Sequence, residues 1–370
     1  MKTIKKKIAI ILPNLNNGGA ERSHVYIANE WQKLGFSVTF ILFEEKGSLI
    51  NLLEQDITII NLNIKKIRKA FFPLIKLFFK KKFDFIVAPM WPITIISTFA
   101  WLLSFKRGKL YLVDHNPIIK LWADDFKINW FVIKISIRLV YNLVNGVVSV
   151  SSGIKDNINS IVKINQKKIR VIYNPIKYNA DILIKDSQIK TKLFGESKLN
   201  IVSTGSLKKS KDYGTLINAI DLLIKRKNNL KLFILGEGEE RLKLEKLIQE
   251  KKLHKNIKLV GHVHNPMEYL FNGDLYVNTS LYDGLPLSLI EALLSGIPII
   301  STNCESGPRE ILNNGKYGKL IPINDYKSLS DEIEKFIESK NYISTAPKNI
   351  NKIYNPYNIS KEYLDFFNIR

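Results

Sequence analysis

The stretch GDLYVNTSLYDGLPLSLIEALLSGIPIISTN, residues 273–303, contains the pattern of a strand, a helix and a second strand in direct succession. Residues 273–280 read as a buried strand, and the glycine and proline of LYDGLP are typical of a loop. A helix then runs from Leu287 to its end at Gly296, and Pro298 prevents its continuation. The stretch therefore predicts one β–α–β unit of a parallel sheet.

Two acidic residues stand out in this unit. Asp283 lies in the loop, and Glu291 lies eight positions later inside an otherwise apolar helix. Because ligands bind at the carboxyl ends of strands in open parallel sheets, both acids are candidates for a binding site. A buried carboxylate needs a hydrogen-bond donor or a cation beside it. Ribose hydroxyls suit Glu291 and sugar hydroxyls suit Asp283, whereas a nearby lysine is the purely structural alternative. The backbone N–H groups of Leu287 and Ser288, at the helix start, are suited to an anion.

Short apolar runs alternate with helix-length segments on both sides of this unit. The alternation predicts an α/β fold class with two Rossmann-like doubly wound domains that face a cleft. The polar residues 174–198 lack a clear period, which favours a domain boundary there. We expect domains at 1–175 and 176–345, and a helical segment at 346–370 that can pack back on the first domain. The strand candidates are KIAIILPN, FSVTFILF, ITIINLN, FDFIVAP, KLYLVDHN, GVVSVS and IRVIYNP, then LNIVSTGSL, LKLFILGEG, IKLVGHV, GDLYVNTS and GIPIISTN.

The chain is strongly basic, with a net charge of +22, and residues 1–175 hold 27 lysines and arginines against 11 acids. Such a field attracts nucleic acid, an anionic membrane surface or phosphorylated substrates. Cys304 is the only cysteine, so an intramolecular disulfide or a thiolate metal cluster cannot form and a reducing compartment suits the chain. The uncharged run from Phe85 to Phe105 is long enough to span a bilayer, but Pro89 and Pro92 divide it into a predicted strand, turn and helix.

Residues 63–83, NIKKIRKAFFPLIKLFFKKKF, contain eight lysines and arginines and no acid. On a helical wheel at about 100° per residue, the cationic and apolar residues occupy separate arcs. This pattern is typical of an interfacial helix on anionic lipid, although Pro73 could break the helix and the apolar arc could belong to the core. The cationic arc is Lys65, Lys69, Lys76 and Lys80, and the apolar arc is Ile67, Phe71, Leu74, Ile75 and Phe78.

Two loops of the first half carry residues suited to a ligand. Gly18 and Gly19 precede a helix predicted from Glu21 to Trp31 and allow the backbone to approach an anion, with a plain tight turn as the alternative. His115 follows a predicted strand in LVDHNP. A histidine at a strand end is suited to a polar site, and a structural histidine is the alternative.

Two loops of the second half also carry candidate ligand-binding residues. Lys208, Lys209 and Lys211 lie between a predicted strand and a helix in STGSLKKSKDYGTLINAI, where positive charge suits a phosphate. For Lys208 and Lys209, the alternative is that they are only solvated surface residues. LGEGEERLKLEKL holds only half of a dinucleotide fingerprint, because Arg241 stands where the third glycine belongs, and it predicts a turn into an exposed helix.

Nine motifs occur in the order found in one family. They are NGGAER, DHNP, VSVSSGI, VIYNPI, TGSLKKSKDYGTLINA, ILGEGEERLKLEKL, SLYDGLPLSLIEAL, GIPIISTNCESGPREIL and GKYGKLIP. The chain resembles, over nearly its whole length, the family-4 retaining glycosyltransferases of the two-domain GT-B type. It looks closest to the branch that builds lipid-linked bacterial surface oligosaccharides such as O-antigen, capsule or glycan precursors.

The resemblance implies a role for each matching residue. Glu291 corresponds to the second acid of the family's E-x7-E motif, which holds the nucleotide ribose, and Asp283, one methylene shorter, corresponds to the first, which contacts the donor sugar. Lys211 corresponds to the lysine on the donor diphosphate. Ser206 stands in place of the family's arginine, with Lys208 or Lys209 as the candidates to supply that charge. The implied catalytic residues are His115, Lys211 and Asp283, and the implied donor-binding residues are Gly18, Gly19, Ser206, Lys211, Gly284, Leu287, Ser288 and Glu291.

The implied reaction moves a sugar from a nucleotide diphosphate, with a UDP-sugar as the expected donor, to a hydroxyl of a lipid-linked saccharide acceptor. The sequence contains no D-x-D motif, and no metal or other cofactor is expected. The implied location is the cytoplasm at the inner face of the cell membrane, with an anionic membrane surface and not nucleic acid as the partner. A sugar-nucleotide epimerase or a glycoside phosphorylase of the same architecture, or a polyanion binder, are the alternatives. The sugar, the linkage, the acceptor, the choice of UDP or GDP and the oligomeric state stay open.

Overall fold

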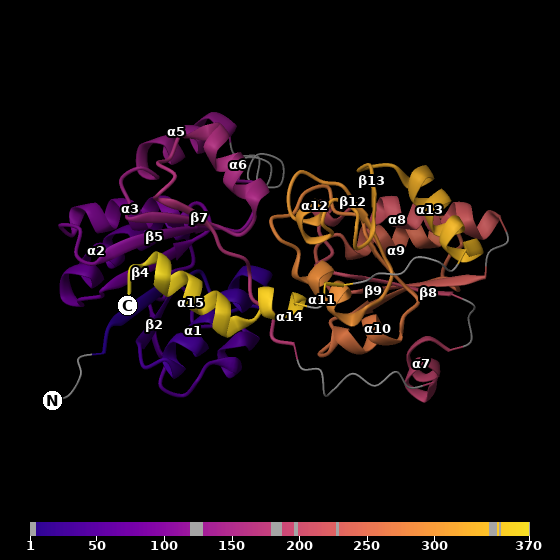
Figure 1. Ribbon diagram of the computed structural model, residues 1–370, viewed down its shortest axis with the longest axis horizontal. Coiled ribbons are helices and arrows are strands. Elements are labelled where there is room, and N and C mark those ends of the chain that lie inside the picture. The colour runs from indigo at the N-terminus through magenta and orange to yellow at the C-terminus, as the bar shows by residue number, and fades with distance from the viewer. Residues whose placement is uncertain are drawn as a thin grey trace. The chain divides into compact units, whose positions relative to one another are not determined.

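The computed structural model describes residues 5–118, 129–178, 187–195, 199–226, 229–339, 346–347 and 349–369. The chain forms two compact units (Figure 1). Unit 1 consists of Met1–Lys177 together with Lys352–Arg370, and unit 2 consists of Tyr178–Asn351. The division falls two residues after the boundary that the sequence predicts at 175/176. The predicted C-terminal segment 346–370 is divided, with the part from Lys352 onward in unit 1.

Unit 1 is built on a parallel sheet of seven strands in the order β3-β2-β1-β4-β5-β6-β7. Its central strands β1, after Lys7, and β4 are continuous buried apolar runs, because helices cover both faces of the sheet. Each of the seven strands predicted for the first half is present. The strands are β1 Lys7–Leu12, β2 Ser37–Leu42, β3 Thr58–Asn61, β4 Phe85–Pro89, β5 Lys109–Asp114, β6 Gly146–Ser149 and β7 Ile169–Val171.

The helices of unit 1 form two layers, one on each face of the sheet (Figure 1). Helix α1 packs against α15, whereas α3 packs against both α2 and α5. The strand order explains this division. The connection from β1 to β2 and the connection from β3 to β4 run in opposite directions along the sheet, so two right-handed connections must cross opposite faces. The helices are α1 Gly19–Lys33, η1 Ser48–Leu52, η2 Ile67–Ala70, α2 Phe71–Lys80, α3 Ile93–Leu103, α5 Trp130–Val140, α6 Ser152–Ile161, α14 Ile350–Ile353 at the junction of the units, and α15 Pro356–Phe366.

Helix α15 completes the core of unit 1. Trp31 of α1 donates its Nε1–H to the carbonyl oxygen of Ser360 over 3.1 Å. Phe367, directly after α15, stacks on Phe85 with 5.3 Å between ring centroids and lies 4.2 Å from the ring of Tyr111. Since burial of one such side chain contributes about 1.5–3 kcal/mol, this contact contributes substantially to the stability of unit 1.

Unit 2 is built on a parallel sheet of six strands in the order β10-β9-β8-β11-β12-β13. Five of the six were predicted, and β13, of sequence KLI, was missed. The strands are β8 Leu199–Thr204, β9 Leu230–Leu235, β10 Ile257–Gly261, β11 Leu275–Asn278, β12 Ile299–Thr302 and β13 Lys319–Ile321. The helices are α7 Ser187–Phe194, η5 Lys209–Lys211, α8 Tyr213–Lys225, α9 Arg241–Glu250, α10 Pro266–Asn272, α11 Leu287–Ser295, α12 Pro308–Ile311 and α13 Tyr326–Ser339.

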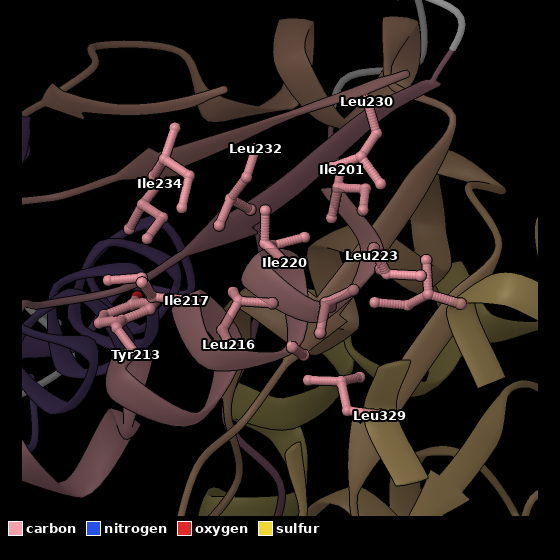
Figure 2. Packing of buried hydrophobic residues seen from close by; sticks show 14 of the residues in the cluster. Ile201, Tyr213, Leu216, Ile217, Ile220, Leu223, Leu230, Leu232, Ile234 and Leu329 are labelled. Carbon is pink, nitrogen blue, oxygen red and sulfur yellow. The ribbon is translucent and has the colours of Figure 1, made fainter. Parts of the chain in front are cut away.

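The core of unit 2 lies between α8 and the sheet (Figure 2). Ile217 and Ile220 of α8 point toward the strand residues Leu232 and Ile234, all four of them fully buried. Leu329 of α13 packs into the same cluster. The apolar spacing of YGTLINAIDLLIK, at three and four residues, produces this buried face.

The basic segment 63–83 is not a single helix. The 3₁₀ turn η2 ends at Ala70 before α2 begins, so Lys65 and Lys69 do not share a helical arc with Lys76 and Lys80. The predicted four-lysine arc is therefore wrong. Pro73 lies in the first turn of α2, where a missing N–H group is tolerated, and it does not break the helix.

The predicted apolar arc of this segment faces the core. Leu74 and Phe78 are buried, and α2 packs against α3. The exposed aromatic residues of α2 are instead Phe72 and Phe79. Leu74 and Phe78 of the arc that the sequence assigned to lipid are thus core, whereas its other three residues are half-buried. A helical wheel cannot tell which apolar side meets the sheet layer.

No described helix is long and apolar enough to cross a bilayer. The uncharged run from Phe85 to Phe105 forms β4, a turn and α3, as the sequence predicts.

Candidate active site

The strand order of unit 2 places a topological switch point between β8 and β11. The chain moves outward from β8 through β9 and β10, and then returns to β11 and moves through β12 and β13 in the other direction. Loops that follow the two strands at such a point diverge, and ligands bind between them. Lys211 follows β8 and Asp283 follows β11. The topology therefore brings together the residues that the sequence singled out.

Lys211 and Asp283 form an ion pair at this point. Lys211 Nζ lies 2.5 Å from Asp283 Oδ2, and the two side chains are 18% and 15% exposed. Ser280 Oγ lies 3.0 Å from the same carboxylate oxygen. The lysine partner considered for a buried carboxylate is thus present for Asp283. An ammonium group has three N–H donors and this pair uses one, which leaves donors for a second anion.

Hydrogen bonds join the loops around this ion pair. Thr279 Oγ1 donates to the carbonyl oxygen of Lys211 over 2.9 Å, and Leu281 N–H donates to that of Ser210 over 2.8 Å. Ser306 Oγ donates to the carbonyl oxygen of Asp283. The backbone on both sides of the ion pair is therefore fixed to neighbouring loops, which holds the pair in one geometry.

Gly205 allows Lys211 to reach this position. Its φ is +153°, and a Cβ atom there would lie 3.0 Å from Tyr213 Oη and 3.4 Å from Lys211 Cε. Tyr213 Oη donates to the Gly205 carbonyl oxygen over 3.2 Å. A side chain at this residue would need to displace the lysine or the tyrosine, which explains the glycine.

The remaining predicted residues of the loop after β8 lie on its surface. Ser206, Lys208 and Lys209 are exposed, whereas Lys211 is largely buried. The 3₁₀ turn at Lys209–Lys211 and the left-handed Asp212 that follows it turn the chain inward, and Asp212 then caps α8 through Thr215 N–H. Of the lysines in this loop, the structure places Lys211 in the ion pair.

Helix α11 presents its N-terminus beside the same loop. Pro286 is its N-cap residue and supplies no side-chain acceptor, so the first backbone N–H groups, at Leu287 and Ser288, are directed out of the helix. Glu291 follows one turn later, and Gly296 ends the helix with φ +73° as predicted. Gly284 is buried in the loop that leads into α11.

Two buried side chains near this site were not identified from the sequence. Burial raises the pKa of Tyr276, a residue of β11, and the carboxylates of Glu291 and Asp283 raise it further, so this side chain lies within electrostatic range of both acids. Burial, followed by the charge of Asp283, raises the pKa of the Cys304 thiol to about 12. Cys304 is therefore an unreactive thiol. Both residues sit in strands or loops that read as core, and no sequence signal separates them from it.

The predicted residues of the first half belong to unit 1. Its switch point lies between β1 and β4, and Gly18 and Gly19 follow β1. Gly18 is the N-cap of α1, which begins at Gly19, two residues earlier than predicted. His115 directly follows β5. The switch-point rule also indicates the turn at Met90–Pro92 after β4, which the sequence analysis treated only as a turn.

His115 contacts a second histidine that the sequence analysis missed. Its Nε2 lies 3.1 Å from Nε2 of His24 on α1, and both rings are buried. Burial lowers the pKa of His115 to about 3, and burial together with His115 lowers the pKa of His24. Both rings are neutral, so one donates and the other accepts. The spacing of His24 with Ile27, Ala28 and Trp31 matches the buried face of α1, which is the signal that marks it as internal.

Asp114 gives a prediction for the pH dependence of stability. Burial raises the pKa of this carboxyl to about 7, although Tyr141 Oη donates to it over 3.1 Å. An unfolded aspartate has a pKa of about 3.9. The stability that the protonated group contributes is therefore complete below about pH 4 and is lost as pH rises through about 7. We expect the free energy of unfolding of the wild type, relative to Asp114→Asn, to fall across this range.

Urea denaturation of both proteins at several pH values measures that difference. The titration of His24 and His115 has the opposite sign, with stability lost as pH falls below about 6.5, but it is common to both proteins and cancels. A difference that is constant between pH 4 and 7 would contradict a protonated Asp114.

Among the described residues, no group of three or more His, Cys, Asp or Glu side chains could hold a metal ion.

Comparison with known proteins agrees with this architecture. Residues 17–179 match the model of Glycosyltransferase Family 4, and residues 184–353 match that of Glycosyl transferases group 1. The chain belongs to the family-4 glycosyltransferases of the GT-B type. The two matched regions of this glycosyltransferase correspond closely to unit 1 and unit 2.

Relatives of this glycosyltransferase align over nearly its whole length. One is the N-acetylgalactosamine-N,N'-diacetylbacillosaminyl-diphospho-undecaprenol 4-alpha-N-acetylgalactosaminyltransferase of Campylobacter jejuni, 27% identical over 94% of this chain and 96% of the relative. Another is the capsular polysaccharide biosynthesis glycosyltransferase CapH of Staphylococcus aureus, 27% identical over 93% and 94%. The crystal structure of Anabaena HepE in complex with UDP-glucose has the same fold, with a TM-score of 0.79, 17% identity and coverage of 98% and 99%.

Proposed function

We propose that this glycosyltransferase moves a sugar from a UDP-sugar to a hydroxyl of a lipid-linked saccharide in the synthesis of a bacterial surface glycan, with retention at the anomeric carbon. The observation that carries the proposal is the Lys211–Asp283 ion pair at the switch point of unit 2, beside the N-terminus of α11. The Campylobacter jejuni relative, named for transfer to a diphospho-undecaprenol saccharide, supports the acceptor class. The HepE complex with UDP-glucose supports the donor class.

In this proposal, unit 2 binds the donor. Lys211 and the backbone N–H groups of Leu287 and Ser288 supply the positive potential for the diphosphate. Glu291 accepts hydrogen bonds from the ribose hydroxyls, and Asp283 orients both Lys211 and the sugar. The charge that develops on the leaving diphosphate is stabilised by groups that are already fixed in place, which is the most effective form of electrostatic catalysis.

The transfer step is a substitution on one face of the sugar. The acceptor oxygen forms a bond to the anomeric carbon as the bond from that carbon to the diphosphate oxygen breaks. The proton of the acceptor hydroxyl passes to the leaving diphosphate, so UDP and the new glycoside are the products. His115, a neutral histidine that follows a strand, is assigned to the transferred sugar.

The donor and acceptor requirement is the test of this function. We expect the enzyme, when incubated with UDP-sugars and a lipid-diphosphate saccharide, to form a longer saccharide and UDP, with an anomeric configuration that matches the donor. Donor alone should give no new sugar nucleotide. Formation of an epimeric sugar nucleotide without acceptor would assign the site to an epimerase instead.

We predict that UDP stabilises the protein in the presence of a chelator. Lys211 and the start of α11 supply the positive charge, so neither binding nor transfer should need a divalent ion. At a hundredfold excess of UDP over its Kd, the free energy of unfolding should rise by about 2.7 kcal/mol. Thermal shift with UDP and EDTA, repeated with magnesium and with GDP, measures this effect. A shift seen only with magnesium would contradict a metal-independent site.

The acceptor and the charge distribution together suggest where the enzyme works. A lipid-linked saccharide is confined to a membrane, and unit 1 contains most of the chain's excess positive charge. We therefore assign the enzyme to the cytoplasmic, inner face of the cell membrane as a peripheral protein that contacts anionic lipid.

A further inference from the structure

Exposed apolar side chains are concentrated on one helical layer of unit 1. Among the described residues, eleven large apolar side chains are exposed on α2, α3, α5 or the turns that follow them, whereas unit 2 exposes Leu242 and Ile323. Phe105, after α3, is 79% exposed. The eleven are Phe72, Phe79, Phe99, Leu103, Phe105, Trp130, Phe131, Val132, Ile135, Leu139 and Leu143.

Helix α5 is apolar on both sides. Its inner side buries Ile133 and Ile137, as a helix on a sheet must. Its outer side repeats Phe131, Ile135 and Leu139 at intervals of four residues, and all three are exposed. A surface helix of a globular protein normally carries polar residues on that side, so this outer side is suited to an apolar environment.

Helix α3 continues the same surface. Phe99 and Leu103 are exposed four residues apart on α3, which packs against both α2 and α5. The ring of Phe105 contacts that of Phe79 of α2 at 5.7 Å between centroids. We name the exposed residues Phe99, Leu103 and Phe105 with Phe131, Val132, Ile135 and Leu139 the apolar ridge.

The helices that carry the apolar ridge bear mainly cationic residues, because apart from Asp84 the charged residues of 71–107 and 130–145 are lysines and arginines. Asp84 is the only acidic residue between Ile57 and Val113, and no acid occurs in α5. Arg107 lies over the ring of Phe79, and Lys134 lies 4.6 Å from the ring centroid of Trp130. Long cationic side chains beside aromatic rings match the boundary between the acyl chains and the anionic head groups of a bilayer.

We infer that the apolar ridge inserts into the surface of an anionic lipid bilayer. A second copy of the chain is a poorer occupant, because symmetric self-association would place cations against cations. The inference rests on the proposed function, because a lipid-linked acceptor requires the enzyme to work at a membrane. It differs from the sequence-based prediction in its residues, since Leu74 and Phe78 of that apolar arc are core and the inserting side chains come from α5, from α3 and from the turn after α3.

Vesicle binding tests the apolar ridge without sugar transfer. The ridge variant is Phe131→Gln, Ile135→Gln and Leu139→Gln together. The matched control is Leu242→Gln with Ile323→Gln, which removes exposed apolar side chains from unit 2. The lysine variant changes Lys65, Lys69, Lys76 and Lys80 to Gln. Each is mixed with vesicles of equal parts phosphatidylglycerol and phosphatidylcholine and separated by flotation at low and high salt.

We expect the ridge variant to lose about 1,000-fold or more in its partition coefficient at both salt concentrations, because three apolar side chains no longer move from water into lipid. The control should bind as the wild type does. The lysine variant should bind less well only at low salt, where charges are weakly screened. Brominated lipid should quench the fluorescence of the wild type, and Trp130→Phe should reduce that quenching.

Three results would overturn the inference. They are the absence of wild-type flotation at low salt, a ridge variant that floats as well as the wild type, and a lipid-free wild type whose self-association disappears in the ridge variant. Melting temperatures of all variants show whether they fold, and Leu103→Gln with Phe105→Gln provides a second ridge variant at the end of α3 and in the turn that follows it. Transfer to a short soluble acceptor, measured separately, reports on the proposed function, so either claim can fail alone.

Discussion

Replacement of Lys211 by methionine is expected to lower kcat/KM about 100- to 1,000-fold, the usual effect of removing a fixed group that stabilises transition-state charge. Methionine retains most of the length of the side chain but carries no charge. The lysine is held at 2.5 Å from Asp283 and is only 18% exposed, so solvent cations cannot readily replace it. Steady-state kinetics with UDP-sugar and acceptor measure the loss.

Lys208→Met and Lys209→Met are the matched controls. Both lysines lie in the same loop but are exposed, and we expect each change to alter kcat/KM by less than about threefold, since screened surface charges contribute at most about 1 kcal/mol. A large loss in either control would show that it supplies the charge that Ser206 lacks. Normal activity of Lys211→Met would remove the diphosphate role from this lysine.

The two acids of the site are expected to separate binding from transfer. Glu291→Gln should raise the Kd for UDP about 10- to 150-fold, because a lost hydrogen bond to a charged group costs about 1.5–3 kcal/mol. Asp283→Asn should leave the Kd for UDP nearly unchanged, since Lys211 then keeps all its N–H groups for the diphosphate, but it should lower kcat. Calorimetric titration with UDP and turnover assays measure the two quantities.

Glu250→Gln, at the exposed end of α9, is the control for loss of a carboxylate. It should change neither quantity. The assignment of the two acids fails if Glu291→Gln binds UDP as the wild type does, or if Asp283→Asn transfers sugar at the normal rate. Melting temperatures are needed beside both assays, because Asp283→Asn also removes the partner of a largely buried lysine.

Strands were easier to predict from the sequence than the faces of helices. A strand buried on both sides, such as β4 Phe85–Pro89 or residues 8–12 of β1, is an unbroken apolar run. Helix α2 shows the opposite case. Its apolar residues alone do not indicate whether Leu74 or Phe72 meets α3, and only tertiary packing decides it.

The site was predictable where chemistry and topology agree. Asp283 and Lys211 each follow a strand, and the β8–β11 switch point brings them together over 72 residues of sequence. His24 escaped notice because its partner, His115, lies 91 residues away and a single histidine in an amphipathic helix gives no signal. Tyr276 and Cys304 likewise have the sequence context of core residues, and only the folded structure shows that they lie near the acids.

The position of α15 delays the completion of the core of unit 1 during protein synthesis. The partners of Trp31, Phe85 and Tyr111 in the core of unit 1 emerge only after all of unit 2 has been translated. At about 5–20 residues per second, this delay lasts roughly 10–35 s. During that interval unit 1 lacks its last helix, so the nascent N-terminal half exposes three aromatic side chains to chaperones until α15 has been synthesised.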